Sequence, residues 1–345
     1  MIHNQDFLTI KQKQTKIMAF SSTSQIYESL QIKNEVNKEQ AREILQQGLK
    51  CKENKNFPQA IDLLTQAISL YEKLQDQSAI AKIYYYLSTI FYKLSNYEDV
   101  IEKASKSLVF AITLKDEQLI GELYGAIGNA YRHLEDHRKA IEYQEKSLNI
   151  FRKLQQPKNE IATLNNLGLA YKNLGDHHKT IKYQQESLIL AQKIHDIDIE
   201  AQILRNLGNA YYAIGNYSEA IFCYNERLEI AHSRKETRLE NQILRNLANA
   251  CYSLGDYEKA IEYNQKRVTI AIKSDNYRSQ AQALSSIGIA YEALDNYQEA
   301  VKFYEECLLL VRKNNDKRIE TQIFERLKVT CYALGDYEKV MKYQL

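Results

Sequence analysis

Polar side chains that could hold a charged ligand recur along the chain at a fixed interval, as between Arg205 and Arg245. In one predicted helix an arginine, an asparagine and a tyrosine stand at positions i, i+4 and i+7, as Arg245, Asn249 and Tyr252. Residues at this spacing lie along one side of an α-helix. Equivalent positions in four successive repeats hold Asn129, Arg132, Asn165, Lys172, Arg205, Asn209, Tyr212, Arg245, Asn249 and Tyr252.

These side chains suit the recognition of an extended acidic peptide. Arginine forms bidentate, charge-assisted hydrogen bonds with carboxylates. Asparagine both donates and accepts, so it can clamp a peptide backbone, and tyrosine adds apolar area with a polar tip. In a stack of helical hairpins such residues repeat along one concave surface. The pattern therefore predicts a groove for a segment that contains Asp or Glu. The alternative is that the same residues only solvate an exposed face.

Other kinds of chemistry find less support. His133 and His137 have the spacing of a metal-binding pair, but they flank a predicted turn and need not share a face. The glycines follow the repeat and form no Gly-rich phosphate loop. Cys51, Cys251 and Cys331 occupy a repeat position that elsewhere holds tyrosine, so we interpret the cysteines as packing residues. We therefore expect no catalytic residue, no metal site and no cofactor.

Charge and composition narrow the class of partner. The 345 residues include 46 Lys and Arg and 44 Asp and Glu, for a net charge of +2. This balance disfavours nucleic acid as a partner. RNA remains an alternative because tyrosine and arginine recur in the groove positions, although Glu292 and Glu325 oppose it. The sequence has no signal-peptide pattern and no apolar run of membrane-spanning length, so we expect a cytoplasmic protein.

The elements that position these residues recur with one exact period, without insertion or deletion. Each repeat has two runs of apolar residues at helical spacing, which indicates a helical hairpin of helix A followed by helix B. In one repeat Gly255 ends helix A and Asp256 begins helix B. A small residue marks every fortieth position, in helix A, at Gly48, Ser88, Gly128, Gly168, Gly208, Ala248 and Gly288.

The repeat resembles the tetratricopeptide repeat. That motif is carried here by Leu207, Gly208, Tyr211, Gly215, Asn216, Tyr217, Ala220 and Ile221. The resemblance covers residues 38–345, and the 40-residue spacing is similar to that of Pins-type adaptors and bacterial repeat arrays. It implies an all-α, right-handed superhelix of helix-turn-helix repeats with helix A lining the concave groove. It also adds Arg227 and Arg267, which resemble groove-facing arginines of the Pins-type adaptors.

The two ends depart from the regular array. Residues 1–35 are polar and lie outside the repeat, so we expect a lead-in segment that is disordered or loosely helical. Residues 36–345 form about eight repeats, and the last stops at Leu345, early in its second helix. We expect this truncated repeat either to precede a missing effector domain or to expose an apolar edge that supports dimerisation.

Together these features predict a non-enzymatic scaffold or adaptor that binds an extended acidic peptide along repeats 3 to 6. The alternative is a sensor or regulatory arm of a larger signalling or protease-type protein whose C-terminal effector is missing. An open question is the identity of the partner, which the residue types describe only as acidic and extended.

Overall fold

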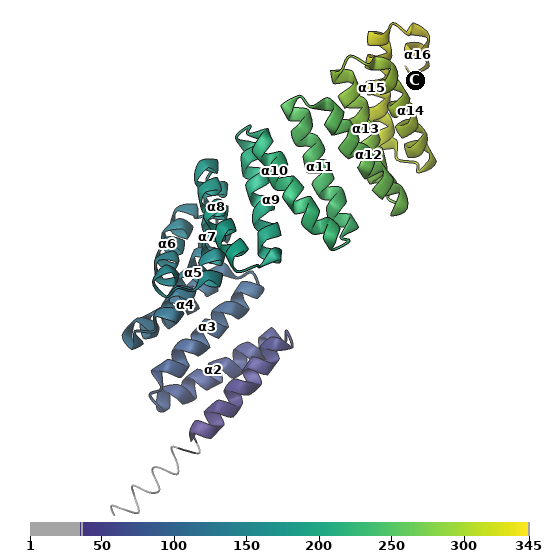
Figure 1. The fold of residues 1–345 in the computed structure, drawn as a ribbon. Coiled ribbons are helices and arrows are strands. Elements are labelled where there is room, and N and C mark those ends of the chain that lie inside the picture. The colour runs from purple at the N-terminus through teal and green to yellow at the C-terminus, as the bar shows by residue number, and fades with distance from the viewer. Residues whose placement is uncertain (1–34, 36, 344–345) are drawn as a thin grey trace, which may run out of the picture. The chain divides into compact units, whose positions relative to one another are not determined.

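The computed structural model describes residue 35 and residues 37–343. Residues 1–34, 36, 344 and 345 lie outside the described part, and they include almost all of the predicted lead-in segment. All regular secondary structure within the described residues is helical (Figure 1). The all-α fold predicted from the repeat is therefore confirmed.

Helices of nearly constant length follow one another along the chain. The first spans residues 37–53, and α2 to α15 contain 17 or 18 residues each. The bounds are α2 (Phe57–Lys73), α3 (Gln77–Lys93), α4 (Tyr97–Leu114), α5 (Glu117–His133), α6 (His137–Lys153), α7 (Pro157–Asn173), α8 (His177–Lys193), α9 (Ile197–Ala213), α10 (Tyr217–Ser233), α11 (Thr237–Leu254), α12 (Tyr257–Lys273), α13 (Tyr277–Ala293), α14 (Tyr297–Lys313), α15 (Lys317–Leu334) and α16 (Tyr337–Lys342).

The helices group into two compact units, Met1–Gln156 and Pro157–Leu345, which we call unit 1 and unit 2. Within each unit every helix packs against the next one in sequence, so consecutive helices form hairpins (Figure 1). Odd-numbered helices from α3 to α15 are the predicted A helices, and even-numbered helices are the B helices. The A helices α9 and α11 therefore carry the C-terminal part of the predicted groove.

A left-handed residue follows each helix up to α15 and divides the repeat into two equal halves. Positive φ angles recur at every twentieth position from Lys55 to Gly335. Glycine occupies only four of these positions, and residues such as Ser95 (φ 58°) and His195 (φ 55°) occupy the rest. The glycine at Gly255 that marks the predicted turn is thus one example of a conformation that both loops of every hairpin adopt.

Asparagine and aspartate begin most of the B helices, as predicted. The Oδ1 atom of Asp136 accepts from the Lys139 amide at 3.1 Å, and that of Asp336 accepts from the Lys339 amide at 3.0 Å. Asn56 makes no such cap, in a helix with proline in its first turn. Similar caps, which the sequence analysis did not single out, begin five A helices at Asp76, Asp116, Asp196, Asn276 and Asp316.

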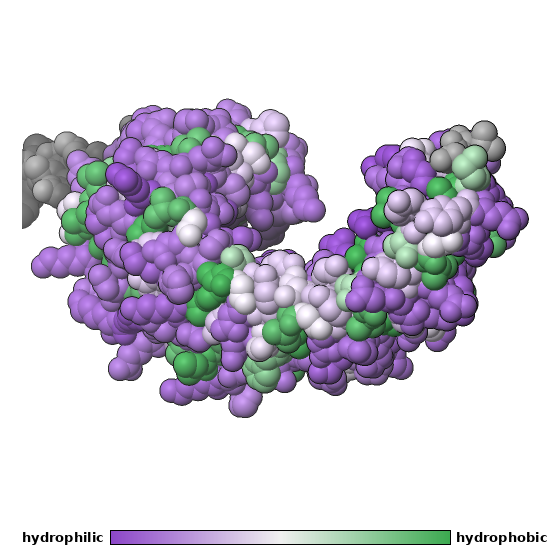
Figure 2. Space-filling view, turned by 90° about the horizontal axis from the view of Figure 1, so that it is seen from above, coloured by the Kyte–Doolittle hydropathy of each residue, from purple (hydrophilic) through white to green (hydrophobic). Residues whose placement is uncertain are grey.

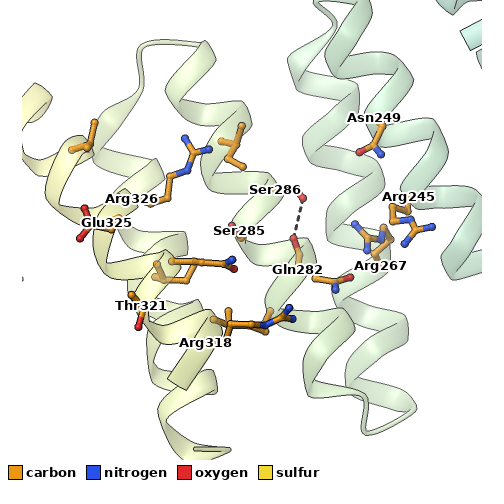
Figure 3. Close-up of a pocket in the computed structure, with 16 residues that line it drawn as sticks. Arg245, Asn249, Arg267, Gln282, Ser285, Ser286, Arg318, Thr321, Glu325 and Arg326 are labelled. Carbon is orange, nitrogen blue, oxygen red and sulfur yellow. Dashed lines mark hydrogen bonds between the residues drawn. The ribbon is translucent and has the colours of Figure 1, made fainter. Parts of the chain in front are cut away.

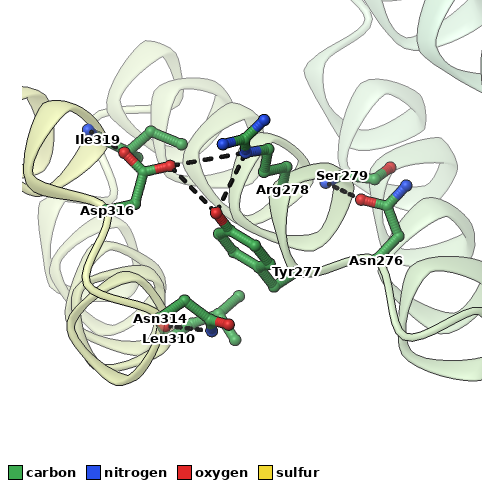
Figure 4. A network of polar contacts seen from close by, with 8 residues as sticks. All are labelled: Asn276, Tyr277, Arg278, Ser279, Leu310, Asn314, Asp316 and Ile319. Carbon is green, nitrogen blue, oxygen red and sulfur yellow. Dashed lines mark hydrogen bonds and ion pairs between the residues drawn. The ribbon is translucent and has the colours of Figure 1, made fainter.

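The cap of α15 also ties it to the previous A helix. Asp316 Oδ2 accepts a hydrogen bond from the Tyr277 hydroxyl of α13 at 3.4 Å (Figure 4). Arg278 Nε donates to the same hydroxyl at 3.1 Å and lies 3.8 Å from Asp316 Oδ2. One carboxylate therefore both starts a helix and fixes its distance from the neighbouring hairpin.

The small residue of helix A faces the helix B residue 16 positions later. A Cβ added to Gly208 would lie 2.5 Å from Tyr224 Cε1, and one added to Gly288 would lie 2.5 Å from Tyr304 Cε1. In repeat 6 the small position is Ala248 and its partner is the smaller Asn264, both buried. The two positions thus vary in size together, because the helices touch there.

Transplanting the repeat 6 pair into repeat 5 tests this contact. Gly208→Ala alone should lower the free energy of unfolding by about 1–3 kcal/mol, because the added methyl group overlaps the Tyr224 ring. Combined with Tyr224→Asn, it should cost less than the sum of the two single changes by about 0.5 kcal/mol or more. Urea unfolding followed by circular dichroism measures these values. Strictly additive losses would contradict the contact.

The left-handed residue after each helix gives a second prediction. The change in melting temperature should have opposite signs at a loop that lacks glycine and at a loop that has it. Ser95→Gly should raise the melting temperature, because a non-glycine residue in this conformation costs about 1 kcal/mol. Gly215→Ala should lower the melting temperature by a similar amount, since Gly215 has φ 77° and open space around it. Thermal unfolding of both variants checks the pair, and a shift of the same sign in both would contradict it.

Candidate functional site

Each helix B has one buried position that contacts helix A, and the residue type at this position differs between repeats. In repeats 2 to 4 it is a serine whose hydroxyl donates to a helix A carbonyl 26 residues earlier; Ser147 donates to Gly121 O at 2.8 Å. In repeat 7 Cys307 does the same toward Ala281 O at 3.3 Å. Arg227 and Arg267 occupy this position in repeats 5 and 6. Two large cations thus stand where other repeats place a small hydroxyl or thiol.

Both arginines are buried without a counter-charge. Arg227 is 8% exposed and Arg267 is 3% exposed, and neither forms an ion pair with a described residue. The Nε atom of each lacks a hydrogen-bond partner, while Arg267 Nη1 donates to Asn264 Oδ1 at 2.7 Å. The sequence analysis assigned both to the groove, and the structure shows them as buried side chains rather than freely exposed ones.

A second arginine near each buried one adds to the positive charge. Burial, and then the nearby Arg245, lower the pKa of Arg267 to about 10. Burial, and then Arg205, lower the pKa of Arg227 in the same way. Both effects oppose the charged form; Glu236 offsets them in part at Arg227, and no carboxylate does so at Arg267 among the described residues. An anionic ligand would stabilise the charged form of both buried arginines.

Three of the four predicted groove residues of repeat 6 line a cavity of about 830 Å³ in unit 2 (Figure 3). Arg245 and Asn249 come from α11 and Arg267 comes from α12. The other walls are α13 and α15, which belong to repeats 7 and 8, beyond the repeats 3 to 6 to which the sequence analysis assigned the groove. Their polar contributions are Gln282, Ser285, Ser286, Arg318, Thr321, Gln322, Glu325 and Arg326.

The cavity carries an excess of positive charge. Arg326 lies 3.3 Å from Glu292, and Glu325 lies 3.3 Å from Lys328, so these side chains are partly neutralised. Arg245, Arg267 and Arg318 form no ion pair with any residue that the structure describes. Three guanidinium groups are therefore left for a ligand.

A smaller cavity of about 240 Å³ adjoins the first and shares three lining residues with it, Asn249, Ser286 and Ile289. It is lined by Tyr212, Asn249, Tyr252 and Ser253, among others, and Asn249 also lines the larger cavity. The Tyr212 hydroxyl lies 3.1 Å from Ser253 Oγ. The structure thus brings five of the predicted groove residues together around these two cavities: Tyr212, Arg245, Asn249, Tyr252 and Arg267.

The remaining predicted residues of unit 2 line neither cavity. Lys172 and Arg205 are exposed. Asn165 and Asn209 are half-buried, and their side-chain oxygens already accept hydrogen bonds within the stack. Asn165 Oδ1 accepts from Gln184 Nε2 at 3.0 Å, and Asn209 Oδ1 accepts from the Tyr224 hydroxyl at 2.8 Å. Asn165 Oδ1 accepts a second hydrogen bond from Asn206 Nδ2 at 3.0 Å, so mainly its amide donors are left for a peptide.

Two predicted residues belong to unit 1. Asn129 Oδ1 accepts from Gln144 Nε2 at 3.1 Å, which repeats the arrangement of Asn165. Arg132 Nη2 lies 2.9 Å from His133 Nε2, and His133 stacks on Tyr97 with ring centroids 4.4 Å apart. His133 also contacts the Tyr92 hydroxyl at 3.0 Å, so its ring packs among aromatic side chains of α3 and α4.

Arg318 and Arg326 are the main residues that the sequence analysis missed. It followed fixed sets of helix A positions, three per repeat, and the set that contains Arg245 leads through Ser285 to Glu325. Arg318 and Arg326 stand on either side of that set, seven residues before and one after Glu325. A search of all polar positions within two turns of Glu325, and not only of the positions equivalent to Arg245, could have found both arginines.

The cysteines pack as interpreted from their repeat positions. Four are buried, and Cys51 is partly exposed. Burial raises the pKa of Cys223 and Cys307 to about 12 and that of Cys251 to about 11. These thiols therefore stay protonated and are poor nucleophiles near neutral pH.

Hydrophilic residues cover most of the face drawn in Figure 2, and its hydrophobic patches are small and separate. Large exposed apolar side chains such as Ile189, Phe222 and Leu309 are spread over different helices. Within the described part of the chain, no helix has the length and apolar character needed to cross a membrane. The larger cavity of unit 2 combines an apolar lining with charged and hydrogen-bonding side chains.

Comparison with known proteins identifies the repeat. A sequence model of the tetratricopeptide repeat matches residues 119–172, 159–233 and 239–313, and a second such model matches residues 205–269. The chain belongs to the tetratricopeptide repeat family. The family predicted from the motif in repeat 5 is therefore confirmed. No curated protein matches the sequence.

Solved structures share the tetratricopeptide fold at low sequence identity. A STAND signal-transduction ATPase with a tetratricopeptide repeat sensor, from Pyrococcus horikoshii, is 23% identical with a TM-score of 0.58; the match covers 82% of this chain and 42% of that one. The apo form of RapI is 13% identical with a TM-score of 0.58, covering 80% and 99%. The C-terminal part of a repeat protein from Cytophaga hutchinsonii is 15% identical with a TM-score of 0.61, covering 80% and 97%.

Replacing a buried arginine by the serine of other repeats tests the cost of its charge. Arg267→Ser should raise the free energy of unfolding by about 1 kcal/mol or more, because it removes an unpaired buried cation. The new hydroxyl can repeat the bond that Ser147 makes to helix A. Denaturant unfolding measures the change. A loss of stability as large as that of a core truncation would show that Arg267 is satisfied in a way that its contacts do not reveal.

Proposed function

We propose that this tetratricopeptide repeat protein is a non-enzymatic interaction scaffold that holds an extended acidic segment of a partner protein against unit 2. Tetratricopeptide repeat proteins are typically interaction modules without catalytic activity. The observation that carries the proposal is the repetition of one arrangement in repeats 5 and 6. Each places a buried, unpaired arginine near an exposed arginine, as Arg227 with Arg205 and Arg267 with Arg245.

The arrangement favours an acidic segment for two reasons. A carboxylate near a buried guanidinium gains a strong, charge-assisted hydrogen bond and offsets a charge that the fold alone leaves unpaired. Two such positions one repeat apart can hold two acidic residues of the same extended chain. Asn249 and Tyr252, on the same helix as Arg245, are available for its backbone and apolar side chains. We place the scaffold in the cytoplasm, as its sequence predicts.

A second candidate is the sensor arm of a larger signalling protein. The STAND protein with a similar fold carries its tetratricopeptide repeats as a sensor, and this chain spans 42% of its length. In that role the same acidic ligand would be the signal, and a C-terminal effector would respond to it. The two candidates share the ligand-binding surface and differ in what lies beyond it.

Reversing the charge of the two exposed arginines tests the groove. Arg205→Glu combined with Arg245→Glu should abolish co-purification of partner proteins, because two attractive charges become repulsive ones. Binding of the unaltered protein should also weaken as salt rises, since salt screens exposed charges. Affinity purification followed by mass spectrometry, repeated at two salt concentrations, measures both effects.

The matched control reverses two lysines outside the cavities. Lys193→Glu combined with Lys273→Glu makes the same change in net charge on exposed residues that line neither cavity. This variant should retain the partners. If the arginine variant keeps the same partners, or if both variants lose them equally, the assignment of the groove is wrong.

A further inference from the structure

The larger cavity of unit 2 holds more positive charge than one carboxylate can balance. Arg245, Arg267 and Arg318 line it without a described ion pair, and Arg267 is 3% exposed. A carboxylate brings a single negative charge, which would leave two of the three arginines uncompensated. A group with a charge near −2 matches the cavity better.

We propose that this cavity binds a phosphate monoester carried by the segment that lies in the groove, so that the scaffold recognises a phosphorylated partner. This inference rests on the proposed function and names the chemical group that one position of the groove selects. A phosphorylated serine or threonine carries a charge of about −1.5 to −2 at neutral pH and has three strong acceptor oxygens. Arginine is well suited to such a group, because its fork of donors binds two oxygens at once.

The donors around the cavity outnumber what a carboxylate can use. Arg267 Nε is buried and has no hydrogen-bond partner, and Arg245 stands beside it in the cavity (Figure 3). Gln282 and Gln322 add neutral donors from α13 and α15, whereas the Thr321 hydroxyl already donates to Lys317 O at 2.9 Å. Three phosphate oxygens can accept from several of these groups at once, whereas the two oxygens of a carboxylate leave more of them unpaired.

Not every polar group in the cavity is free for the ligand. Ser286 Oγ already donates to Gln282 O at 2.9 Å (Figure 3). Arg326 is held by Glu292 at 3.3 Å and borders the cavity as a partly neutralised charge. The binding positions are therefore centred on Arg245, Arg267 and Arg318, which three different helices contribute.

The other walls favour a phosphorylated side chain over a nucleotide. Ile289, Ile319, Ile323 and Val329 give the cavity an apolar border that can hold the carbon atoms of a peptide. None of the described residues that line it is aromatic, so a nucleobase would find no ring on which to stack. The cavity thus fits a phosphate on a short aliphatic stem.

Titration with small peptides tests this inference without knowledge of the partner. The probe is an end-capped pentapeptide with phosphoserine between two pairs of glycines, and the comparison probes replace phosphoserine by glutamate or by serine. Isothermal titration calorimetry in a phosphate-free buffer should show the phosphopeptide binding about ten-fold or more tighter than the glutamate peptide. Inorganic phosphate is titrated separately and should bind more weakly than the phosphopeptide.

Two variants locate the site, and a third is the matched control. Arg267→Ser and Arg245→Gln should each weaken phosphopeptide binding about ten-fold or more, because each removes a charged donor from the cavity. Lys273→Gln removes a positive charge from an exposed residue of α12 outside both cavities, and it should change the affinity less than two-fold, about the scatter of such titrations. Arg245 is exposed, so its replacement tests the site even if Arg267→Ser fails to fold.

Several results would overturn the inference. Equal affinity for the phosphoserine and glutamate peptides would show a carboxylate position instead, and an equal loss from Lys273→Gln would place the phosphate elsewhere. Inorganic phosphate binding as tightly as the phosphopeptide would indicate a free anion as the ligand. No phosphopeptide binding up to about 10 mM would also reject it. In each case co-purification that still depends on Arg205 and Arg245 would leave the proposed function intact.

Discussion

The close contact between helix A and helix B at the small residue of each repeat is the constraint on which the other features depend. At Gly208 the backbone of α9 comes so near to the Tyr224 ring that no side chain fits between them. This contact sets the register of the hairpin. One helical turn after Tyr224 comes Arg227, and one turn after Asn264 comes Arg267, which donates to it at 2.7 Å. The contact therefore also decides where the buried arginines lie.

The same register explains why the fold could be predicted in detail and the site only in part. Local rules of helix packing and capping fix the spacing of the small residues, of the asparagines and aspartates at the turns, and of the apolar positions. The hairpins and their order could therefore be derived from the sequence. Which polar residues meet in space depends on the distance between successive A helices, and the period of the sequence carries no such distance. Arg245 and Asn249 were found, because they lie on the helix face that was followed. Arg318 and Arg326 come from a helix whose equivalent position is Glu325, and only the packed structure shows that they border the same cavity.

The burial of Arg227 and Arg267 was also beyond the reach of the pattern. From sequence alone, a polar residue on a helix with many polar neighbours is predicted to be exposed. The serines at the equivalent positions of other repeats do not indicate how deeply a larger side chain would be buried. The structure shows that these cations replace a hydroxyl that bonds to helix A, as Ser147 does. A fold that keeps an unpaired charge where a serine is known to fit sacrifices stability at that point. Such a sacrifice is typical of residues retained for binding rather than for folding.

The left-handed residue at every twentieth position has a consequence for how such a chain can change in length. Because the loops after helix A and helix B have the same conformation, a gain or loss of half a repeat would still close every turn. It would, however, place a helix B sequence where helix A belongs. The large tyrosine or glutamine of helix B would then face another large side chain, at the contact that needs the glycine of helix A. A gain or loss of one whole repeat restores both the turns and the contact. The array can therefore lengthen or shorten by recombination only in whole hairpins, and each such event would move the arginine positions relative to one another by one complete step.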